Sequence, residues 1–130
     1  MNLEEFLALP DVDGIEEEVF VSKRLGTFKV RAMTQEDFKD YQRQATGNNK
    51  ISKKGLNFDI SKFNLLMVAG QTINPDFSNA ELLKKANCAT PAELISRKLL
   101  AGEIAELAKQ IQTISGFDNE PEEDIEEAKN

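Results

Sequence analysis

The chain has 130 residues, a formal net charge of −7 at pH 7, one cysteine and no histidine. A single thiol cannot form an internal disulfide, and the lack of histidine excludes Ser-His and Cys-His catalysis together with the commonest zinc ligand. The length and the hydrophobic fraction of 40% are typical of one globular domain with its own core.

The first segment is short, amphipathic and acidic. Leu3, Phe6 and Leu7 recur at helical spacing, and Pro10 followed by residues 11–14 predicts a turn. We expect one or two helical turns here that dock on the body. The segment is too acidic and too poor in apolar residues for a signal peptide, so we expect a protein of the cytoplasm.

Residues 17–33 predict a β-hairpin with one buried face. Apolar and polar side chains alternate along both halves, and a Gly lies between them for the turn. One face is therefore expected to lie in the core and the other, which carries basic side chains, in water. The buried set is Val19, Val21, Phe28, Val30 and Ala32, and the basic set is Lys29 and Arg31.

A helix is expected to follow the hairpin. Thr34 is a good N-cap, and Glu36 and Asp37 lie in the first turn, where the helix dipole favours acids. Gly47 is expected to end this helix. The polar segment 47–58 then predicts either a mobile loop or a weak second hairpin.

The next helix is expected to be the central one. Asp59 or Ser61 caps a segment that runs through Gly70 and is apolar on all sides. A helix of this kind is usually surrounded by the rest of the fold.

Two short helices with capping boxes are predicted next. Ser78 precedes Glu81 by three residues, and Thr90 precedes Glu93 by three, with Pro91 at the first helical position. In such a box the two side chains each satisfy a backbone donor at the start of the helix.

The last predicted helix covers residues 103–115, after a break at residues 101–102, and Gly116 is expected to end it. Its apolar stripe is expected to face the core or a partner. We predict one domain over residues 1–117, followed by a disordered acidic tail over residues 118–130. The fold class is α+β: an N-terminal antiparallel β-hairpin packed against a bundle of four or five helices.

Charge is distributed unevenly along the chain. Residues 1–18 hold seven acids and no base, residues 19–117 hold 15 bases and nine acids, and residues 118–130 hold seven acids and one base. The acidic ends either stay solvated, or one of them covers a binding face until a partner displaces it.

A basic cluster is the first candidate binding site. Six basic side chains between residues 23 and 43 are candidates for phosphate binding. No aromatic residue that could stack on a base shares their face of the hairpin, which argues against nucleic acid. The six are Lys23, Arg24, Lys29, Arg31, Lys39 and Arg43.

Other reactive side chains give no active site. The paired acids at 36–37 and at 16–18 are explained by the helix dipole and by exposure, and no carboxylate has an evident partner that would shift its pKa. Cys88 is interpreted as a small core residue. We therefore assign no residue to catalysis, to a cofactor or to a metal, and the sequence does not place a partner-binding surface.

Four segments together carry a resemblance to a known family. They read SKR at 22–24, FKVRAMT at 28–34, NPDFSNAELL at 74–83, and KLLAGEIAEL continuing to ISGFD at 98–118. Their order resembles the XkdN-like tail assembly chaperones of bacteriophages and prophages. The resemblance covers residues 15–118, without support from the loop 47–58 or the two acidic ends.

The resemblance implies a chaperone without catalytic activity that binds the tape measure protein and keeps it soluble during tail tube assembly. It implies a location in the cytoplasm of the bacterial host and absence from the mature virion. The tail tube protein and a second copy of the chain are further candidate partners, and no cofactor, nucleic acid or membrane is expected.

Two alternative functions stay open at this point. The first is a small nucleic-acid-binding module that uses residues 23–54. The second is a structural component of the tail.

Overall fold

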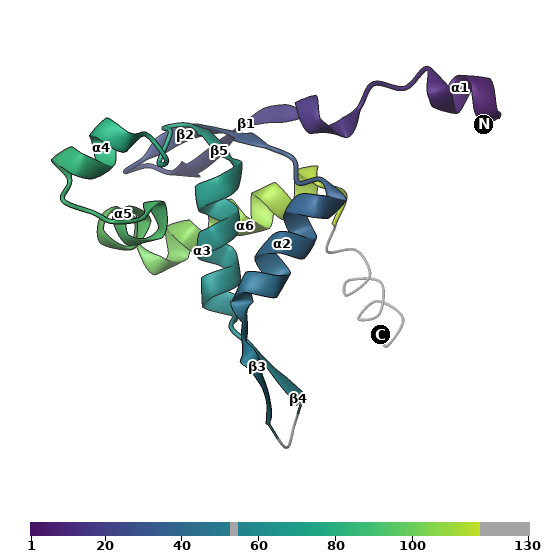
Figure 1. The fold of residues 1–130 in the computed structure, drawn as a ribbon. Helices are drawn as coiled ribbons and strands as arrows, with labels where there is room; N and C mark the ends of the chain where they lie inside the picture. The colour runs from purple at the N-terminus through teal and green to yellow at the C-terminus, as the bar shows by residue number, and fades with distance from the viewer. Residues whose placement is uncertain (53–54, 118–130) are drawn as a thin grey trace, which may run out of the picture.

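The computed structural model describes residues 1–52 and 55–117, with side chains for residues 1–47 and 58–117. A three-stranded antiparallel sheet lies against the last helix, α6 (Ala101–Ile114), which in turn packs on α3 (Ile60–Gln71) (Figure 1). This arrangement confirms the predicted α+β fold class. The acidic tail predicted at 118–130 lies outside the described residues.

The predicted hairpin is confirmed. Strand β1 (Glu16–Ser22) pairs with β2 (Gly26–Arg31), and Gly26 adopts a φ of +73° in the turn, a conformation that a residue without Cβ reaches at little cost. The alternation of burial also agrees with the sequence pattern. Val19, Val21, Phe28, Val30 and Ala32 are buried, whereas Phe20 and Lys29 are exposed.

The third strand of the sheet was not predicted. Strand β5 (Thr72–Asn74) pairs with β2, with Val30 opposite Thr72. It has only three residues and follows helix α3 (Ile60–Gln71) with no turn between them. A segment this short shows no alternation, so periodicity cannot reveal it.

Helix α2 (Gln35–Ala45) begins as expected, with a capping box between Thr34 and Asp37. It ends before Gly47, which corrects the predicted end. Thr46 is β-branched and adopts an extended conformation that opens strand β3 (Thr46–Ser52). This strand pairs with β4 (Gly55–Phe58), so the second hairpin is the alternative that the structure supports.

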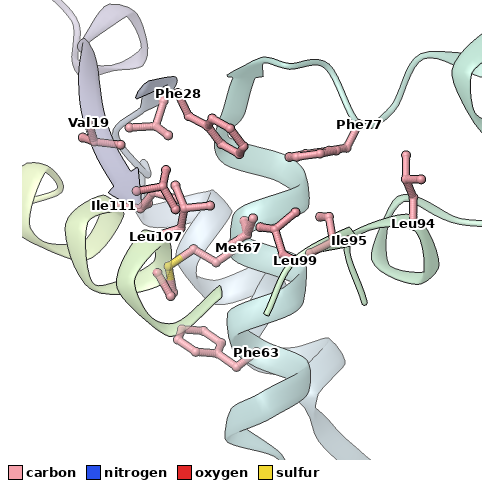
Figure 2. Packing of buried hydrophobic residues seen from close by; sticks show 14 of the residues in the cluster. Val19, Phe28, Phe63, Met67, Phe77, Leu94, Ile95, Leu99, Leu107 and Ile111 are labelled. Carbon is pink, nitrogen blue, oxygen red and sulfur yellow. The ribbon is translucent and has the colours of Figure 1, made fainter. Parts of the chain in front are cut away.

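Helix α3 is the central helix, as predicted, and the Asp59 side chain caps it. Phe63, Met67 and Val68 are buried on it. In Figure 2 Met67 lies at the centre of the core, with Leu107 and Ile111 on one side and Ile95 and Leu99 on the other.

The capping prediction was wrong for helix α4 (Ala80–Lys85). Asn79 caps this helix by accepting a hydrogen bond from the Leu82 amide, while the Ser78 amide donates to the Asp76 carboxylate. Ser and Asn are both good caps, so two adjacent candidates give an ambiguous start.

Helix α5 (Pro91–Lys98) begins at Pro91 with Thr90 as its cap, as predicted. The box itself is different from the predicted one. The Glu93 carboxylate accepts from the Ala89 amide at 3.0 Å, so it satisfies the donor before the cap residue rather than that of Thr90.

The last helix starts earlier than predicted. Helix α6 (Ala101–Ile114) includes Gly102 in its first turn, and the break from α5 lies at Leu99 and Leu100. Leu107, Ala108 and Ile111 are buried, so the apolar stripe faces the core. Gly116, with a φ of +95°, ends the helix as predicted. The Phe117 amide donates back to the Gln112 carbonyl at 2.9 Å.

The N-terminal segment forms the short helix α1 (Leu3–Leu7) and the 3-10 helix η1 (Val12–Gly14), and neither contains a buried residue. The expected docking on the body is therefore wrong. Figure 1 shows α1 well apart from the remaining elements, beyond the start of β1.

Candidate functional site

The six basic side chains of the hairpin region do not form one open anion-binding face. Three of them make ion pairs: Arg24 with Glu103, Lys29 with Glu16, and Arg43 with Asp40. Because paired cations offer less attraction to phosphate, this arrangement weakens the nucleic-acid interpretation. Lys23, Arg31 and Lys39 lie on the turn, β2 and α2 respectively.

The buried Glu103 was missed at the sequence level, and it corrects the expectation that no carboxylate has a partner. Its carboxylate accepts hydrogen bonds from Ser22 Oγ at 2.6 Å and from Arg24 Nε at 3.2 Å. Arg24 Nη2 and the Leu100 amide, the latter at 2.7 Å, also donate to this carboxylate, and Arg24 donates to the Lys98 carbonyl at 2.9 Å. These bonds join the hairpin turn to the corner between α5 and α6.

The hydrogen bonds from Arg24, then those from Ser22 and the backbone, lower the pKa of Glu103 to about 2. This direction is the one expected for a carboxylate that accepts several bonds in its charged form. A structural role explains the whole arrangement, because the partners are protein groups that link two elements. No sequence signal reveals it, since 79 residues separate Arg24 from Glu103.

A second polar network lies between α2, α3 and the sheet. The Tyr41 hydroxyl donates to Gln71 Oε1 at 2.6 Å, and Gln71 Nε2 donates to the carbonyls of Arg31 and Ala32, each at 3.0 Å. Burial, followed by the charge of Asp37, raises the pKa of Tyr41 to about 12. The phenol therefore stays protonated as a hydrogen-bond donor, which fits a structural role.

The remaining candidate groups have structural explanations. Asp37 caps its own helix, and Glu16 pairs with Lys29 across the hairpin. Cys88 is buried in the core cluster. Across residues 1–52 and 55–117, no group of three or more Asp, Glu, Cys or His side chains is placed to hold a metal ion. No helix in those ranges is long and apolar enough to cross a membrane.

The first candidate surface for a partner is the N-terminal arm, defined here as residues 1–15. In α1 the side chains of Leu3, Phe6 and Leu7 are 71%, 60% and 71% exposed. They recur at helical spacing and so form one apolar face, with Glu4 and Glu5 beside it. An apolar helix face without cover is typical of an element that docks on another surface.

The second candidate surface is an open groove of about 390 Å³ between α4 and α5, called here the α4–α5 groove. Its apolar floor belongs to the edge of the core, and two lysines lie at its rim. Leu82 is 39% exposed there, whereas Phe77 and Leu94 are buried (Figure 2). The lining residues are Phe77, Leu82, Lys85, Ala86, Leu94 and Lys98.

A further hollow of about 530 Å³ lies at the base of the β3–β4 hairpin, where Phe58 and Ile60 are exposed. Its lining includes Gln44, Thr46, Asp59 and other polar groups, so it offers less continuous apolar surface than the α4–α5 groove. The groove and the arm are therefore the stronger candidates for contact with apolar protein segments.

Comparisons with known proteins give a family match and a relative of similar sequence. Residues 3–129 match the family described as phage XkdN-like tail assembly chaperone protein. The phage-like element PBSX protein XkdN of Bacillus subtilis (strain 168) is 28% identical over 106 residues, which cover 79% of this chain and 72% of XkdN.

The fold itself also has a counterpart of known structure. The crystal structure of the protein YqbN superimposes with a TM-score of 0.69 at 25% identity, covering 91% of this chain and 98% of that one. Because the family match spans nearly all of the sequence, the chain belongs to the phage XkdN-like tail assembly chaperone family.

Proposed function

We propose that the chain binds the tape measure protein and keeps it soluble while the tail tube assembles around it, without catalysis. The observation that supports this most is the family match over residues 3–129. A chaperone of tail assembly needs a surface for apolar segments, and the α4–α5 groove supplies one. The tail tube protein is a further candidate partner.

The groove suits an amphipathic helix of the tape measure protein. Leu82 and the buried Phe77 and Leu94 supply an apolar floor, and Lys85 and Lys98 supply a basic rim. A helix laid in such a groove buries its apolar stripe and places acidic flanking residues near the lysines. An open groove of this size favours reversible binding, which a chaperone needs in order to release its client.

The proposal also includes a place of action. The chain acts in the cytoplasm of the bacterial host and leaves the tail before the virion is complete. The rival interpretation as a structural tail component predicts instead that the chain is found in purified particles.

Binding is tested by co-expressing the tagged chain with the tape measure protein and measuring how much of the latter is retained on affinity resin. We expect Leu82→Asp to reduce retention at least about tenfold, because a charge on the groove floor opposes apolar docking. Leu82 is partly exposed, so the variant is expected to fold.

The matched control is Ile60→Asp at the hairpin hollow. Ile60 is exposed and lies in the first turn of α3, where an acid is tolerated. Equal retention by Leu82→Asp and the wild type would refute the groove as the binding site. Retention of the chain on heparin with a steep salt dependence, and no capture of the tape measure protein, would favour the nucleic-acid alternative.

A further inference from the structure

The N-terminal arm and the α4–α5 groove are complementary in chemistry. The arm offers an apolar helix face made by Leu3, Phe6 and Leu7, and the groove offers an apolar floor that includes the partly exposed Leu82. Both surfaces would gain by removing their apolar area from water. The arm consists of a single short helix, α1, joined to β1 by a short link.

The charges of the two surfaces are opposite. The arm contains four acids and no Lys or Arg, and two of these acids, Glu4 and Glu5, lie in α1. The groove carries Lys85 and Lys98 at its rim, both exposed. Neither lysine makes an ion pair with the carboxylates in the part of the chain that the structure describes. A docked arm would supply the missing counter-charges.

The arm leaves its own body in the wrong direction to reach its own groove. The Ile15 carbonyl accepts from the Ala32 amide at 2.9 Å, which extends the hairpin ladder away from the turn. The groove lies at the other end, since Arg24 in that turn bonds the Lys98 carbonyl. Figure 1 accordingly shows α1 and the α4–α5 pair at opposite ends of the molecule.

The length of the link makes return to the same body unfavourable. The hairpin between these ends is about 20 Å long at about 3.3 Å per residue. Residues 8–14, which connect α1 to Ile15, span at most about 25 Å when fully extended, and the 3-10 turn at Val12–Gly14 shortens them. After a reversal at Ile15 the link would exceed the hairpin by only about 5 Å, so α1 reaches the groove of its own body only with the 3-10 turn lost and the link fully extended.

We propose that the N-terminal arm docks into the α4–α5 groove of a second copy of this chain. The sequence left open that an acidic end covers a binding face until a partner displaces it. In this proposal the acidic N-terminal end does so, and the face that it covers belongs to a neighbouring molecule. The further consequence, that a client helix displaces the arm from the groove, rests on the proposed function. The docking itself does not.

The test uses charge reversal in two full-length variants. One carries Glu4→Lys and Glu5→Lys in the arm, and the other carries Lys85→Glu and Lys98→Glu in the groove. All four side chains are exposed, so both variants are expected to fold. Sedimentation velocity over a wide range of protein concentration measures self-association of the wild type, of each variant alone, and of an equal mixture.

We expect reversible self-association of the wild type, at least about tenfold weakening in each variant alone, and restored association in the mixture. In the mixture each arm again faces a groove of opposite charge on the other variant. Adding Phe6→Asp to both variants should abolish the mixed complex, because burial of one large apolar side chain is worth about tenfold or more in Kd.

Three results would overturn the proposal. These are a wild type that stays monomeric at all concentrations, a mixture that does not associate, and association that survives Phe6→Asp. If the arm instead docks on its own body, it cannot link two molecules, and the mixture of the two variants does not associate. No tape measure protein is present in this assay, so its outcome is separate from that of the proposed function.

Discussion

At the scale of single residues, Glu103 shows how one buried carboxylate can hold distant parts of a fold together. Its partners are Ser22 at the end of β1, Arg24 in the hairpin turn, and the Leu100 amide at the start of α6. Because the folded protein lowers the pKa of Glu103 to about 2 from an ordinary 4.5, the charged form stabilises the fold.

The stabilisation of the fold by the charged Glu103 carboxylate should decrease as the pH falls. It is fully present above about pH 4.5, and it is lost as the pH falls from there through about 2, where the folded carboxyl also takes up a proton. We expect Glu103→Gln to lower the free energy of unfolding at pH 7, and the gap from wild type to shrink below pH 4.5.

Urea denaturation at several pH values measures this gap. Glu16→Gln is the control, since it breaks the partly exposed pair with Lys29 and should change stability by at most about 1 kcal/mol. A gap for Glu103→Gln that stays constant from pH 7 to the acid limit would contradict the role given to its charge.

Two helical glycines should respond oppositely to alanine. A Cβ on Gly70 would lie 2.0 Å from the Tyr41 hydroxyl, whereas a Cβ on Gly102 meets nothing within 4 Å. We expect Gly70→Ala to destabilise by about 1–3 kcal/mol through overpacking. Gly102→Ala should stabilise by up to about 1 kcal/mol, because Gly102 lies within α6.

Thermal denaturation of the Gly70→Ala and Gly102→Ala variants measures both changes in stability. A loss of stability in Gly102→Ala would support the predicted break at that residue instead of the helix that the structure contains. Unchanged stability in Gly70→Ala would mean that Tyr41 can move aside without losing its bond to Gln71.

At the scale of elements, the hairpin carries the clearest relation between sequence and structure. Val30 has no exposed surface, and it pairs with residues on both neighbouring strands, Glu17 in β1 and Thr72 in β5. We expect Val30→Asp to unfold the protein or lower its Tm strongly, because burying a carboxylate without a partner costs more than the roughly 2–7 kcal/mol of a neutral polar group.

Thr27→Asp on the exposed side of the same strand is the control, and it should change the Tm little. Circular dichroism on heating distinguishes the two. A Val30→Asp variant that melts like the wild type would remove the assignment of that face to the core.

Local chemistry predicted the elements well where a pattern repeats. The alternation around Val19 and Phe28, the caps Thr34 and Thr90, and the all-round apolar helix at 60–71 each have a signal within a few residues. Strand β5 has too few residues for a pattern, and the start of α4 offers two adjacent caps. The first error therefore reflects a missing local signal, and the second reflects two competing signals of similar strength.

At the scale of the whole molecule, the sequence placed neither binding surface. The helical spacing of Leu3, Phe6 and Leu7 predicted a helix docked on the body. The structure shows instead that these three side chains are exposed. The α4–α5 groove depends on how two short helices meet at the edge of the core, which no local spacing encodes. Both surfaces, like the pairing of Arg24 with Glu103, arise from tertiary contacts between segments that are distant in the sequence.

The two surfaces give the molecule a coherent way of working. The core helices α3 and α6 and the sheet form the scaffold, and the groove lies at its edge. In the proposed mode of action this groove accepts an apolar helix of the client. In the same proposal, the arm of a second copy fills that groove when no client is present. This mode of action rests on apolar contact between polypeptides and requires no bond to be made or broken.

The most direct measurement is the fraction of tape measure protein that stays in solution when it is made in cells with and without this chain. We expect the wild type and Ile60→Asp to keep it soluble, and Leu82→Asp to leave it in the insoluble fraction. Two results would refute this mode of action. One is a tape measure protein that is as insoluble with the wild type as without any chaperone, and the other is one that is as soluble with Leu82→Asp as with the wild type.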